Sequence, residues 1–485
     1  MANTQLIGIH LGTSGVRVSV YGLDGTVVAG GEASIEQQTI AAWKQGLREA
    51  TPRLPDRGIC SVVSTSGTAV LVDETGEPVF RPQMYYKAAP EGATRLQEAT
   101  TAEELSEDIA LSPTSPLAKV LRLREDHPDR FADVEWILSP ATWLLYELSY
   151  EGSTRWRNVE TDWTNALKFG ADVTPSLPRW FEPLFEDIDL PLQLLPPIRP
   201  PGSFIGVADS ELARRTGLSG LKLYQGMTDG SASALANGVA EPGDFGIVWG
   251  AASLVKYVAK SVEPHDALYY HRHPIEGYLP GAAFDSASMF QWVCDRLLDR
   301  SVPRGLELAR RTAPGEEYRV FLQGNRSPFF DPSVGGSVLG LRHDTDLSAA
   351  EVHGQLARGV ATGIALAEYT YLPIIEELFE TSIDEVRLMH DDVSSPEDPT
   401  GWLSELRASV WQRPVVQMEP RTTAGLLIPP ALITGEYDDV EAASDSLLRP
   451  RTTFEPDPDI SEIYDDQRRA YLGRWNVLAD LYPAE

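Results

Sequence analysis

A single aspartate in the middle of the chain has the setting that a general base requires. Asp229 follows an apolar-alternating run that predicts a short strand, and a segment of small residues that predicts a closely packed helix comes after it. A carboxylate at such a junction lies near the positive end of a helix, which keeps it ionised. The flanking Gly226 and Gly230 would let a substrate approach closely. The segment therefore predicts a proton-accepting carboxylate, although on this segment alone an N-cap aspartate between two turn glycines is the more ordinary interpretation.

The turn near the N-terminus could bind a phosphate. Strands are predicted at residues 6–9, 16–20 and 26–29, and the first two are joined by Gly12-Thr13-Ser14-Gly15. A turn of this composition directs several N–H groups and a hydroxyl into one concavity, which suits a phosphate group. Taken alone, the same residues are more often an ordinary hairpin turn.

Length and charge restrict the class of protein. A chain of 485 residues is too long for one compact core and predicts two domains. Its 71 acidic and 41 basic residues give a formal net charge of -30, which repels nucleic acid and anionic lipid. Because there is no apolar run of membrane-spanning length and no leader before the first strand, we expect a cytoplasmic protein. Cys60 and Cys294 lack disulfide or metal spacing and are expected to be buried and unreactive.

Several segments, in order, resemble motifs of the FGGY family of carbohydrate kinases, within the actin-like ATPase superfamily. They are residues 7–17 (first phosphate motif), 59–73 (strand, sugar loop and hairpin), 143–148 with 162–168 (sugar-facing part), 226–229 (catalytic base), 242–250 (second phosphate motif) and 324–331 (C-terminal-domain loop). The resemblance rests on the order and spacing of these segments over nearly the whole chain. Within the family, the sequence is most similar to the xylulokinase and D-ribulokinase-like branch.

The resemblance implies an α/β, two-domain actin-like ATPase fold, with a ribonuclease-H-like core in each domain and a cleft between the domains. We expect an N-terminal domain over residues 1–238 and a C-terminal domain over 239–485. The implied activity is ATP-dependent phosphoryl transfer, with Mg²⁺, to a hydroxyl of a ketopentose or related sugar. The implied partners are a small-molecule sugar and a nucleotide, and the oligomeric state is left open, with a homodimer as one option.

The resemblance also implies roles for individual residues. Asp229 would be the catalytic base and would contact the sugar. The phosphates and the nucleotide would bind Gly12, Thr13, Ser14, Arg17, Gly250, Ala251 and Ser253. The sugar would bind Ser66, Gly67, Thr68, Asp162 and Asn165. Lys168 and the loop around Arg326 are retained as well.

The sequence departs from the family pattern at four places. His10 stands where family members carry an aspartate, and an imidazole is a poor ligand for Mg²⁺, so the metal ligands stay unassigned. A histidine packed beneath the hairpin is the structural alternative for this residue. Ala251 replaces a threonine hydroxyl, for which Ser253 could compensate only if the loop shifted. Lys87 replaces a carboxylate of the sugar loop, and residues 390–396 replace a Gly-Gly-Gly-Ala turn that would accommodate adenosine.

These departures leave two functions open. The first is the sugar kinase with Asp229 as its base. The second is a catalytically impaired pseudokinase that binds a sugar or a protein partner without phosphoryl transfer.

In the C-terminal half, the pattern predicts a long helix over residues 351–372 ended or kinked by Pro373, an acidic connection over 455–464 and a closing helix over 467–481.

Overall fold

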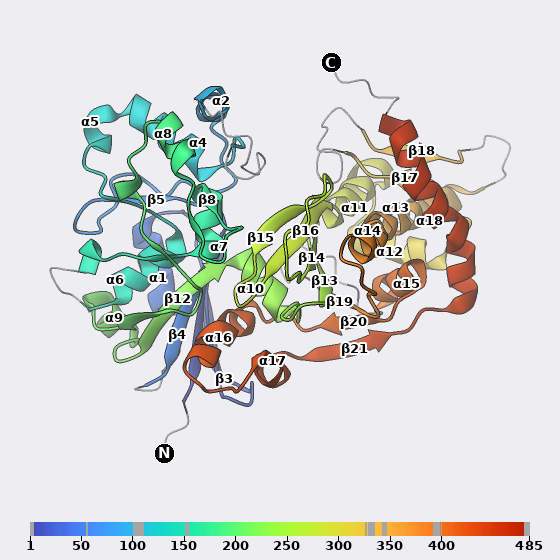
Figure 1. Cartoon of the computed structure of the whole chain (residues 1–485). Coiled ribbons are helices and arrows are strands. Elements are labelled where there is room, and N and C mark those ends of the chain that lie inside the picture. Colours follow the sequence, from blue (N-terminus) through green and yellow to red (C-terminus); the bar gives the residue numbers. More distant parts are fainter. Residues whose placement is uncertain are drawn as a thin grey trace. The chain divides into compact units, whose positions relative to one another are not determined.

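The computed structural model describes residues 4–54, 57–99, 111–150, 155–324, 327, 335–341, 347–390, 398 and 400–479. The chain forms two compact units, each described by itself (Figure 1). Unit 1 consists of Met1–Ala236, His271–Glu276 and Arg421–Leu448, and unit 2 of Asn237–Tyr270, Gly277–Pro420 and Arg449–Glu485. None of the helices within the described ranges has the length and apolarity of a membrane span.

A six-stranded sheet forms the centre of unit 1. Its strand order is β11-β12-β4-β1-β2-β3. The strands are β1 (Leu6–Leu11), β2 (Gly15–Tyr21), β3 (Val27–Ser34), β4 (Ile59–Ser64), β11 (Phe204–Val207) and β12 (Lys222–Thr228). β1, β2 and β3 are antiparallel neighbours, β4 and β12 run parallel to β1, and β11 is an antiparallel edge. The hairpin predicted from alternating valines is therefore confirmed.

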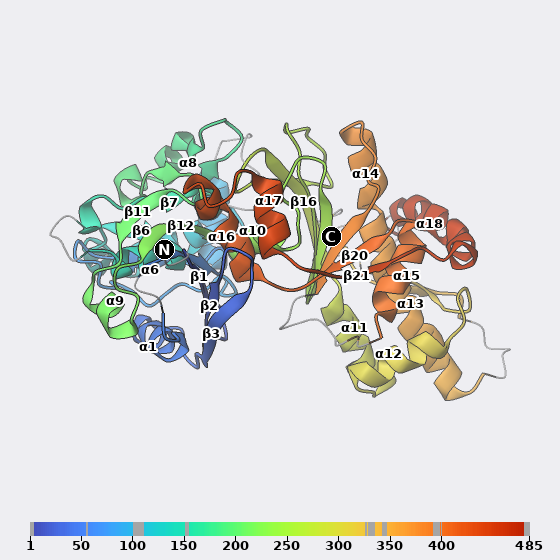
Figure 2. The ribbon, with the colours of Figure 1, turned by 90° about the horizontal axis from the view of Figure 1, so that it is seen from below.

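The alternation of β1 explains how helices cover both faces of this sheet. On one face of the sheet, every second residue of β1 is apolar and packs in one core with Trp43 and Leu47 of α1 (Ile40–Ala50). These residues of β1 are Ile7, Ile9 and Leu11. On the other face, a Cβ on Gly8 would lie 2.7 Å from Cβ of Thr423 in α16 (Thr422–Ile433). The glycine thus allows α16 to lie directly on the sheet, beside α10 (Asp229–Ala236), as Figures 1 and 2 both show.

The rest of unit 1 surrounds this sheet. α6 (Pro140–Leu148), α9 (Glu211–Thr216) and α17 (Val440–Leu447) are helices near it. A second core joins β5 (Val70–Val72), β6 (Trp136–Leu138), α2 (Pro90–Ala99), α4 (Pro116–Asp126), α5 (Pro128–Phe131) and α8 (Glu182–Asp187). Shorter elements are β7 (Thr161–Asp162), α7 (Trp163–Ala166), β8 (Ala171–Asp172), β9 (Arg179–Trp180) and β10 (Ile198–Arg199).

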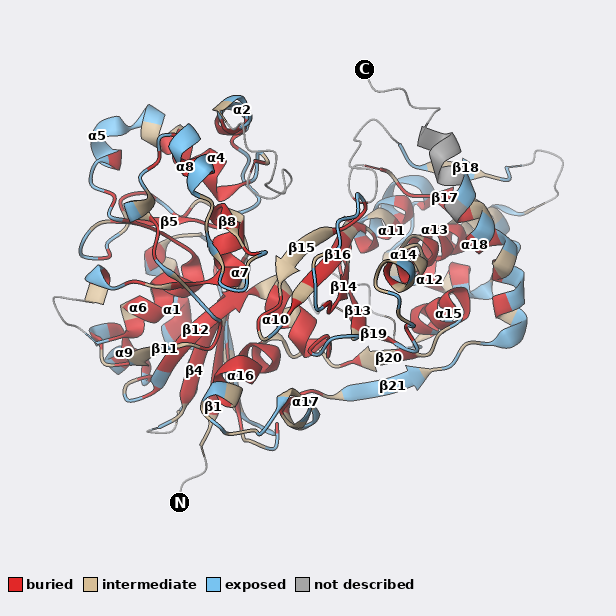
Figure 3. Cartoon of the chain, viewed as in Figure 1, coloured by how far each residue is buried: buried red, intermediate tan, exposed pale blue. Residues whose placement is uncertain are grey.

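A seven-stranded sheet forms the centre of unit 2; its inner strands are mostly buried, whereas its last strand in the sheet order is largely exposed (Figure 3). Its order is β15 (Tyr269–Arg272), β16 (Tyr278–Asp285), β14 (Ala252–Tyr257), β13 (Phe245–Trp249), β19 (Val386–His390), β20 (Val415–Met418) and β21 (Pro450–Phe454). The helices are α11 (Ala287–Val293), α12 (Val302–Arg311), α13 (Ala349–Tyr369), α14 (Tyr371–Leu378), α15 (Trp402–Trp411) and α18 (Pro458–Ala479), and β17 (Arg319–Phe321) pairs with β18 (Ser337–Leu339).

The two sheets share one topology. In unit 1, β3-β2-β1 are antiparallel, β4 and β12 follow in parallel to β1, and β11 is the antiparallel edge. In unit 2, β16-β14-β13 are antiparallel, β19 and β20 follow in parallel to β13, and β21 is the antiparallel edge. This repeat is the ribonuclease-H-like arrangement that the sequence led us to expect, and the α/β fold class is confirmed.

Two C-terminal predictions need correction. The long helix is present as α13, but Pro373 lies in the first turn of α14, where its missing N–H costs nothing, and does not end α13. The acidic connection expected over residues 455–464 is largely helical, because α18 begins at Pro458 and buries Ser461 and Tyr464. Cys60 and Cys294 are free and buried, as predicted.

Candidate active site

Three strands of unit 1 end side by side at the candidate site. In the parallel registers, Ser64 of β4 is the partner of both Leu11 of β1 and Thr228 of β12. The turn after β1, the loop after β4 and the residue after β12 therefore start from the same edge of the sheet. In open α/β sheets, this carboxyl edge is where ligands bind.

Asp229 lies at this edge, at the junction that the sequence predicted. β12 ends at Thr228 and α10 begins at Asp229. Its carboxylate Oδ1 accepts hydrogen bonds from the backbone N–H of Gly230, 2.8 Å away, and from that of Ser66, 3.4 Å away. Two N–H donors favour the ionised form of the carboxylate, which is the form that accepts a proton.

Lys168 provides a positive charge close to this carboxylate. Burial lowers the pKa of the Lys168 ammonium to about 8, and the negative charge of Asp229 opposes that shift. The ammonium group is therefore still mostly protonated at neutral pH. The pair combines a base with a cation that can stabilise negative charge on a reacting group.

Gly226 has a different role from the one expected. It lies inside β12, at a register shift in the pairing with β4, and not in a turn before Asp229. A Cβ at this position would overlap with the backbone carbonyl oxygen of Val62 in β4. Gly226 is thus required because two backbones approach closely at the end of the strand that carries Asp229.

The turn after β1 leaves backbone donors available. The N–H of Gly12 bonds to the carbonyl of Gly15, 2.9 Å away, and closes the turn. Within the described residues, the N–H groups of Thr13 and Ser14 have no acceptor. The amide of Gln38 donates to the Thr13 carbonyl (2.5 Å), and the Thr13 hydroxyl donates to the phenol oxygen of Tyr85 (3.4 Å). Two adjacent unpaired N–H groups in a rigid turn can bind an anion.

Arg17 and His10 lie opposite each other on the two strands of this hairpin. The guanidinium of Arg17 lies 3.6 Å from the carboxylate of Glu32 on β3 and is partly exposed. The His10 Nε2 lies 3.5 Å from the position that a Cβ on Gly12 would take, so the imidazole packs against the turn. This placement agrees with the structural alternative for His10, and the phosphate role of Arg17 stays a prediction.

The sugar loop after β4 is held in place by hydroxyl groups. The hydroxyls of Thr65 and Thr68 are 2.9 Å apart, and that of Thr68 also accepts the backbone N–H of Tyr85 (3.2 Å). Gly67 has a φ of 76°, in the left-handed region that favours glycine. The Ser66 hydroxyl oxygen is buried and has no hydrogen-bond partner among the described residues. It is therefore the polar group of this loop that a ligand could satisfy.

Asp162 and Asn165 form a capping structure. Asp162 caps α7, and its carboxylate accepts bonds from both the backbone and the side chain of Thr164 and of Asn165. Burial raises the pKa of Asp162, whereas these hydrogen bonds lower it. The Thr164 hydroxyl in turn accepts the N–H of Thr228 (2.9 Å), next to the base. These contacts give Asp162 a positioning role, and its direct contact with a sugar stays a prediction, as does that of Asn165.

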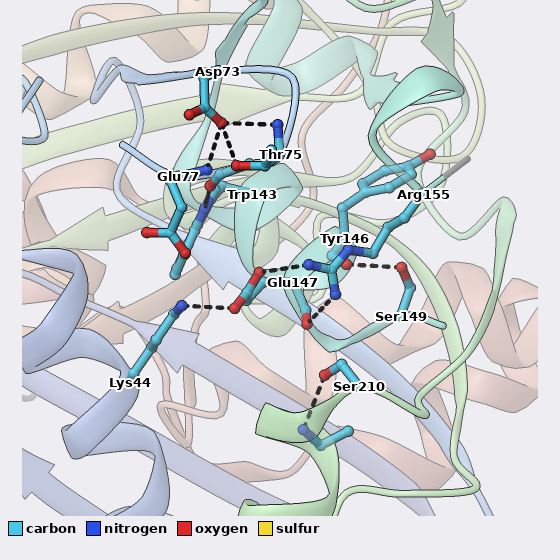
Figure 4. Close-up of polar contacts among 12 residues, drawn as sticks. Lys44, Asp73, Thr75, Glu77, Trp143, Tyr146, Glu147, Ser149, Arg155 and Ser210 are labelled. Atoms are coloured by element: carbon cyan, nitrogen blue, oxygen red, sulfur yellow. Dashed lines mark hydrogen bonds and ion pairs between the residues drawn. The ribbon is translucent and has the colours of Figure 1, made fainter. Parts of the chain in front are cut away.

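Residues 143–148, expected to face the sugar, are part of the core instead. Trp143 is fully buried in α6, and its indole N–H donates to the Gly76 carbonyl, 3.3 Å away (Figure 4). Glu147 of the same helix pairs with Lys44 at 2.6 Å and with Arg155 at 3.2 Å. Trp143 and Tyr146 share one hydrophobic core with the sheet strands, so these aromatic residues support the site without lining it.

In unit 2, the turn between β13 and β14 is the topological counterpart of the turn after β1. The carbonyl of Ala251 accepts bonds from the backbone of Ser286 (3.1 Å) and from the backbone and hydroxyl of Ser288 (3.2 and 2.7 Å). The Gly250 carbonyl accepts the Ser286 hydroxyl (3.1 Å). The start of α11 thus holds the turn in one conformation. The phosphate contacts of Gly250 and Ala251 stay predictions.

Ser253 does not face this turn. Its side chain is fully buried in β14, and its hydroxyl donates to Oε1 of Glu368, 2.7 Å away. Glu368 forms a buried ion pair with Arg407, whose Nε is 2.8 Å from Oε2. Because its hydroxyl is committed to this network, Ser253 does not replace the missing threonine hydroxyl in this conformation.

The same network reaches the end of β19. The guanidinium of Arg407 lies over the ring of Trp249, 4.6 Å from its centroid, and the rings of Trp249 and His390 are 5.1 Å apart. Burial, together with the nearby charge of Arg407, lowers the pKa of His390 to about 4, so this imidazole is neutral at pH 7. Of residues 390–396, which replace the expected glycine-rich turn, only His390 is described; residues 391–396 lie outside the described residues, as does Arg326.

Some residues of the site were missed from the sequence. Gln38 and Tyr85 both form hydrogen bonds with Thr13, but they are polar residues in loops, and no periodic sequence pattern distinguishes them from other loop residues. Glu368 and Arg407 could have been identified as a buried pair from the sequence, because each is a charged residue on the otherwise apolar face of a helix. No group of three His, Cys, Asp or Glu side chains suited to a metal occurs in the part of the chain that the structure describes.

Comparisons with known proteins agree with this architecture. Residues 57–236 match the family model of the FGGY family of carbohydrate kinases, N-terminal domain. The xylulose kinase of Lactococcus lactis is 22% identical over 492 residues, covering 94% of this chain and 93% of that protein. Two solved structures from Lactobacillus acidophilus, a ligand-bound xylulose kinase and a gluconate kinase, give TM-scores of 0.83 and 0.82, each at 18% identity and covering 99% of both chains. The structural likeness shows the two-domain fold of these kinases.

Proposed function

Because this chain belongs to the FGGY family of carbohydrate kinases, we propose that it transfers the γ-phosphoryl group of ATP to a hydroxyl of a ketopentose or related sugar, with Asp229 as the general base. The observation that carries the proposal is the carboxylate of Asp229 at the carboxyl edge of the sheet, held by two backbone N–H groups and accompanied by Lys168. Among proteins of similar fold are a xylulose kinase and a gluconate kinase, so the fold serves neutral and acidic acceptors.

In the proposed reaction, the sugar hydroxyl lies against Asp229. Its oxygen attacks the γ-phosphorus as its proton passes to the Asp229 carboxylate, and the bond between that phosphorus and the bridging oxygen of ADP breaks. Lys168 stabilises the negative charge that gathers at the attacking oxygen and the phosphoryl group. The fixed N–H groups of Gly230 and Ser66 orient the carboxylate before the substrate arrives.

The two hairpin turns are the proposed phosphate contacts. The N–H groups of Thr13 and Ser14, which have no acceptor among the described residues, suit an anionic group, and the bond from Gly12 to Gly15 closes the turn that carries them. A divalent metal accompanies ATP in this family, and Mg²⁺ is our proposal for it. The described side chains form no metal cage, which fits an ion that enters on the nucleotide phosphates, because Mg²⁺ keeps several waters and uses few protein ligands.

The comparisons do not favour the pseudokinase alternative. Relatives named as kinases match over nearly the full length of the chain, and the base, the first turn and the sugar loop lie at one sheet edge. His10 packs against the first turn and leaves the backbone N–H groups of Thr13 and Ser14 without an acceptor among the described residues, so these donors stay available to a phosphate.

Calorimetric titration with magnesium-ATP tests the proposal, alone and with D-xylulose or D-ribulose present. We expect ATP to bind in the micromolar to millimolar range and more tightly with the acceptor present, because both substrates complete one site. Absence of nucleotide binding under all these conditions would contradict the proposed function.

A further inference from the structure

A polar pocket in unit 1 lies beside the candidate site, and the activity described so far does not account for it. Its volume is about 480 Å³. One wall is the segment 36–39 between β3 and α1, and the other is the segment 81–87 after the sugar loop. The lining residues are Glu36, Gln37, Gln38, Thr39, Arg81, Pro82, Tyr86 and Lys87. A volume of this size accommodates a small metabolite.

Both walls are attached to the first phosphate turn. From one wall, Gln38 donates its amide to the Thr13 carbonyl and accepts the indole N–H of Trp43 (2.9 Å), which fixes its orientation. From the other wall, the phenol of Tyr85 accepts the Thr13 hydroxyl, and its ring packs edge-on against Tyr86, 5.3 Å away. Thr13 therefore links the two wall segments of the pocket by hydrogen bonds, although it does not line the pocket itself.

The second wall is also attached to the sugar loop. Gln83 and Ala69 exchange two backbone hydrogen bonds of 2.8 and 3.0 Å, directly after Thr68. The hydroxyl of Thr68 accepts a hydrogen bond from the backbone N–H of Tyr85. In the same loop, the backbone N–H of Ser66 donates to the carboxylate of Asp229. The pocket, the sugar loop and the base thus belong to one hydrogen-bonded assembly.

The charges of the pocket favour an anion. Among the described residues, neither Arg81 nor Lys87 has an ion pair or hydrogen bond through its side chain, and both are exposed. Glu36 is the one carboxylate among the lining residues, so the lining carries two positive charges and one negative charge. The net positive charge of the pocket lining contrasts with the formal charge of -30 of the whole chain. Arginine and lysine bind carboxylates through charge-assisted hydrogen bonds.

The remaining lining groups suit a ligand with hydroxyls. Gln37 offers an amide and Tyr86 offers a phenol and a ring face, whereas the Gln38 amide and the Thr39 hydroxyl already make hydrogen bonds within the protein. Apart from Pro82 the lining carries no aliphatic side chain, so a purely apolar ligand gains little there. The chemistry that matches this pocket is a polyhydroxylated molecule with one carboxylate.

We propose that Arg81 and Lys87 bind the carboxylate of a sugar acid, and that the related sugar phosphorylated by this kinase is such an acid. The catalytic part of this statement rests on the proposed function. The carboxylate is a binding group and stays ionised, while a hydroxyl of the same molecule receives the phosphoryl group. Arg81 and Lys87 are then the residues that determine specificity.

Binding is tested on the full chain by calorimetric titration with potassium D-gluconate, D-xylulose and inorganic phosphate, without ATP. We expect gluconate to bind more tightly than the other two. Arg81→Gln and Lys87→Gln should each weaken gluconate binding at least about tenfold and leave D-xylulose binding unchanged, because each removes one charged partner. Lys222→Gln, at an exposed lysine at the other end of β12, is the matched control and should change neither.

Two results would overturn the proposal: gluconate binding that is unchanged in Arg81→Gln and Lys87→Gln, or inorganic phosphate binding as tightly as gluconate, which indicates a general anion site. Assays of phosphoryl transfer separate this inference from the proposed function. Phosphorylation of D-xylulose but not of gluconate contradicts the inference and leaves the kinase assignment intact. Gluconate binding that depends on Arg81 and Lys87, without transfer to any acceptor, supports the binding site and contradicts the kinase assignment.

Discussion

The backbone N–H of Ser66 points at the carboxylate of Asp229, 3.4 Å away, although the two residues are 163 positions apart in the chain. The contact exists because β4 and β12 are parallel neighbours that end at the same level. It brings the loop that resembles a sugar-binding loop to the residue that resembles a catalytic base.

Replacing the base should remove turnover but not binding. We expect Asp229→Asn to lower kcat by about 10² to 10⁴, the range of general-base catalysis, because the amide cannot accept the hydroxyl proton. Sugar affinity should stay within about threefold, since the amide keeps the size of the carboxylate and its oxygen acceptor. Steady-state kinetics and calorimetry measure the two effects. Asp209→Asn, at an exposed aspartate paired with Arg214, serves as the control and should change neither.

Activity should fall as pH rises through the pKa of Lys168. That pKa is lowered to about 8, so the ammonium is charged below this pH and neutral above it. Above pH 8, we expect kcat/KM to decrease by about tenfold per pH unit, because the charge that stabilises the phosphoryl group is lost. In Lys168→Arg the guanidinium stays protonated, so the decrease should disappear below pH 10. A pH profile that is the same in both proteins contradicts a role for Lys168.

Gly226 should not tolerate a side chain. A Cβ there overlaps with the Val62 carbonyl, so Gly226→Ala must separate β12 from β4. We expect a loss of about 3 kcal/mol in the free energy of unfolding, measured with urea. The matched substitution is Gly206→Ala in β11, where a Cβ meets no atom within 4 Å, and its effect should stay within about 0.5 kcal/mol. Equal stability of the two variants would refute the close approach.

The buried ion pair of unit 2 should be costly to break. Arg407 and Glu368 are 2% and 0% exposed, and Glu368 also accepts the Ser253 hydroxyl. We expect Arg407→Ala to lower the free energy of unfolding by about 3 to 5 kcal/mol, because it leaves a carboxylate buried without its cation. Arg304→Ala breaks the exposed pair with Glu307 and should cost at most about 1 kcal/mol. Similar costs for both would contradict the assigned network.

Removal of divalent metal should abolish turnover without unfolding the protein. Because Mg²⁺ keeps several waters and uses few protein ligands, we expect the ion to bind with the nucleotide phosphates. Treatment with EDTA should therefore stop phosphoryl transfer and leave the melting temperature of the protein without ATP unchanged. A melting temperature that drops on chelation would indicate a metal bound by the protein itself.

Local patterns were sufficient to predict the scaffold of the site. The alternating valines at positions 16, 18 and 20 predicted the β1–β2 hairpin, and the apolar run before the small residues predicted the junction at Asp229. The order of the motifs predicted the two-domain fold that the comparisons support. The hairpin and the junction depend on residues that are neighbours in the chain, and the fold depends on the order of the motifs along it. Both kinds of information can be read from a single amino-acid sequence.

The partners of individual side chains could not be predicted in this way. Ser253 looks like a turn hydroxyl, but its partner Glu368 lies 115 residues away, and burial decides its orientation. Gly226 looks like a turn glycine, but the carbonyl of Val62 on a neighbouring strand explains it. The role of Gln38 depends on Thr13, 25 residues earlier. Such contacts follow from packing between distant segments and leave no periodic signal.

The most direct test of the kinase assignment is detection of a phosphorylated sugar by ³¹P NMR. Wild-type protein and Asp229→Asn would each be incubated with magnesium-ATP and, in separate samples, D-xylulose, D-ribulose and D-gluconate. The proposed function predicts a phosphate ester and one ADP per ester with the wild type for at least one acceptor, and no ester with Asp229→Asn. Absence of an ester with the wild type for every acceptor, or equal amounts in both proteins, would contradict it.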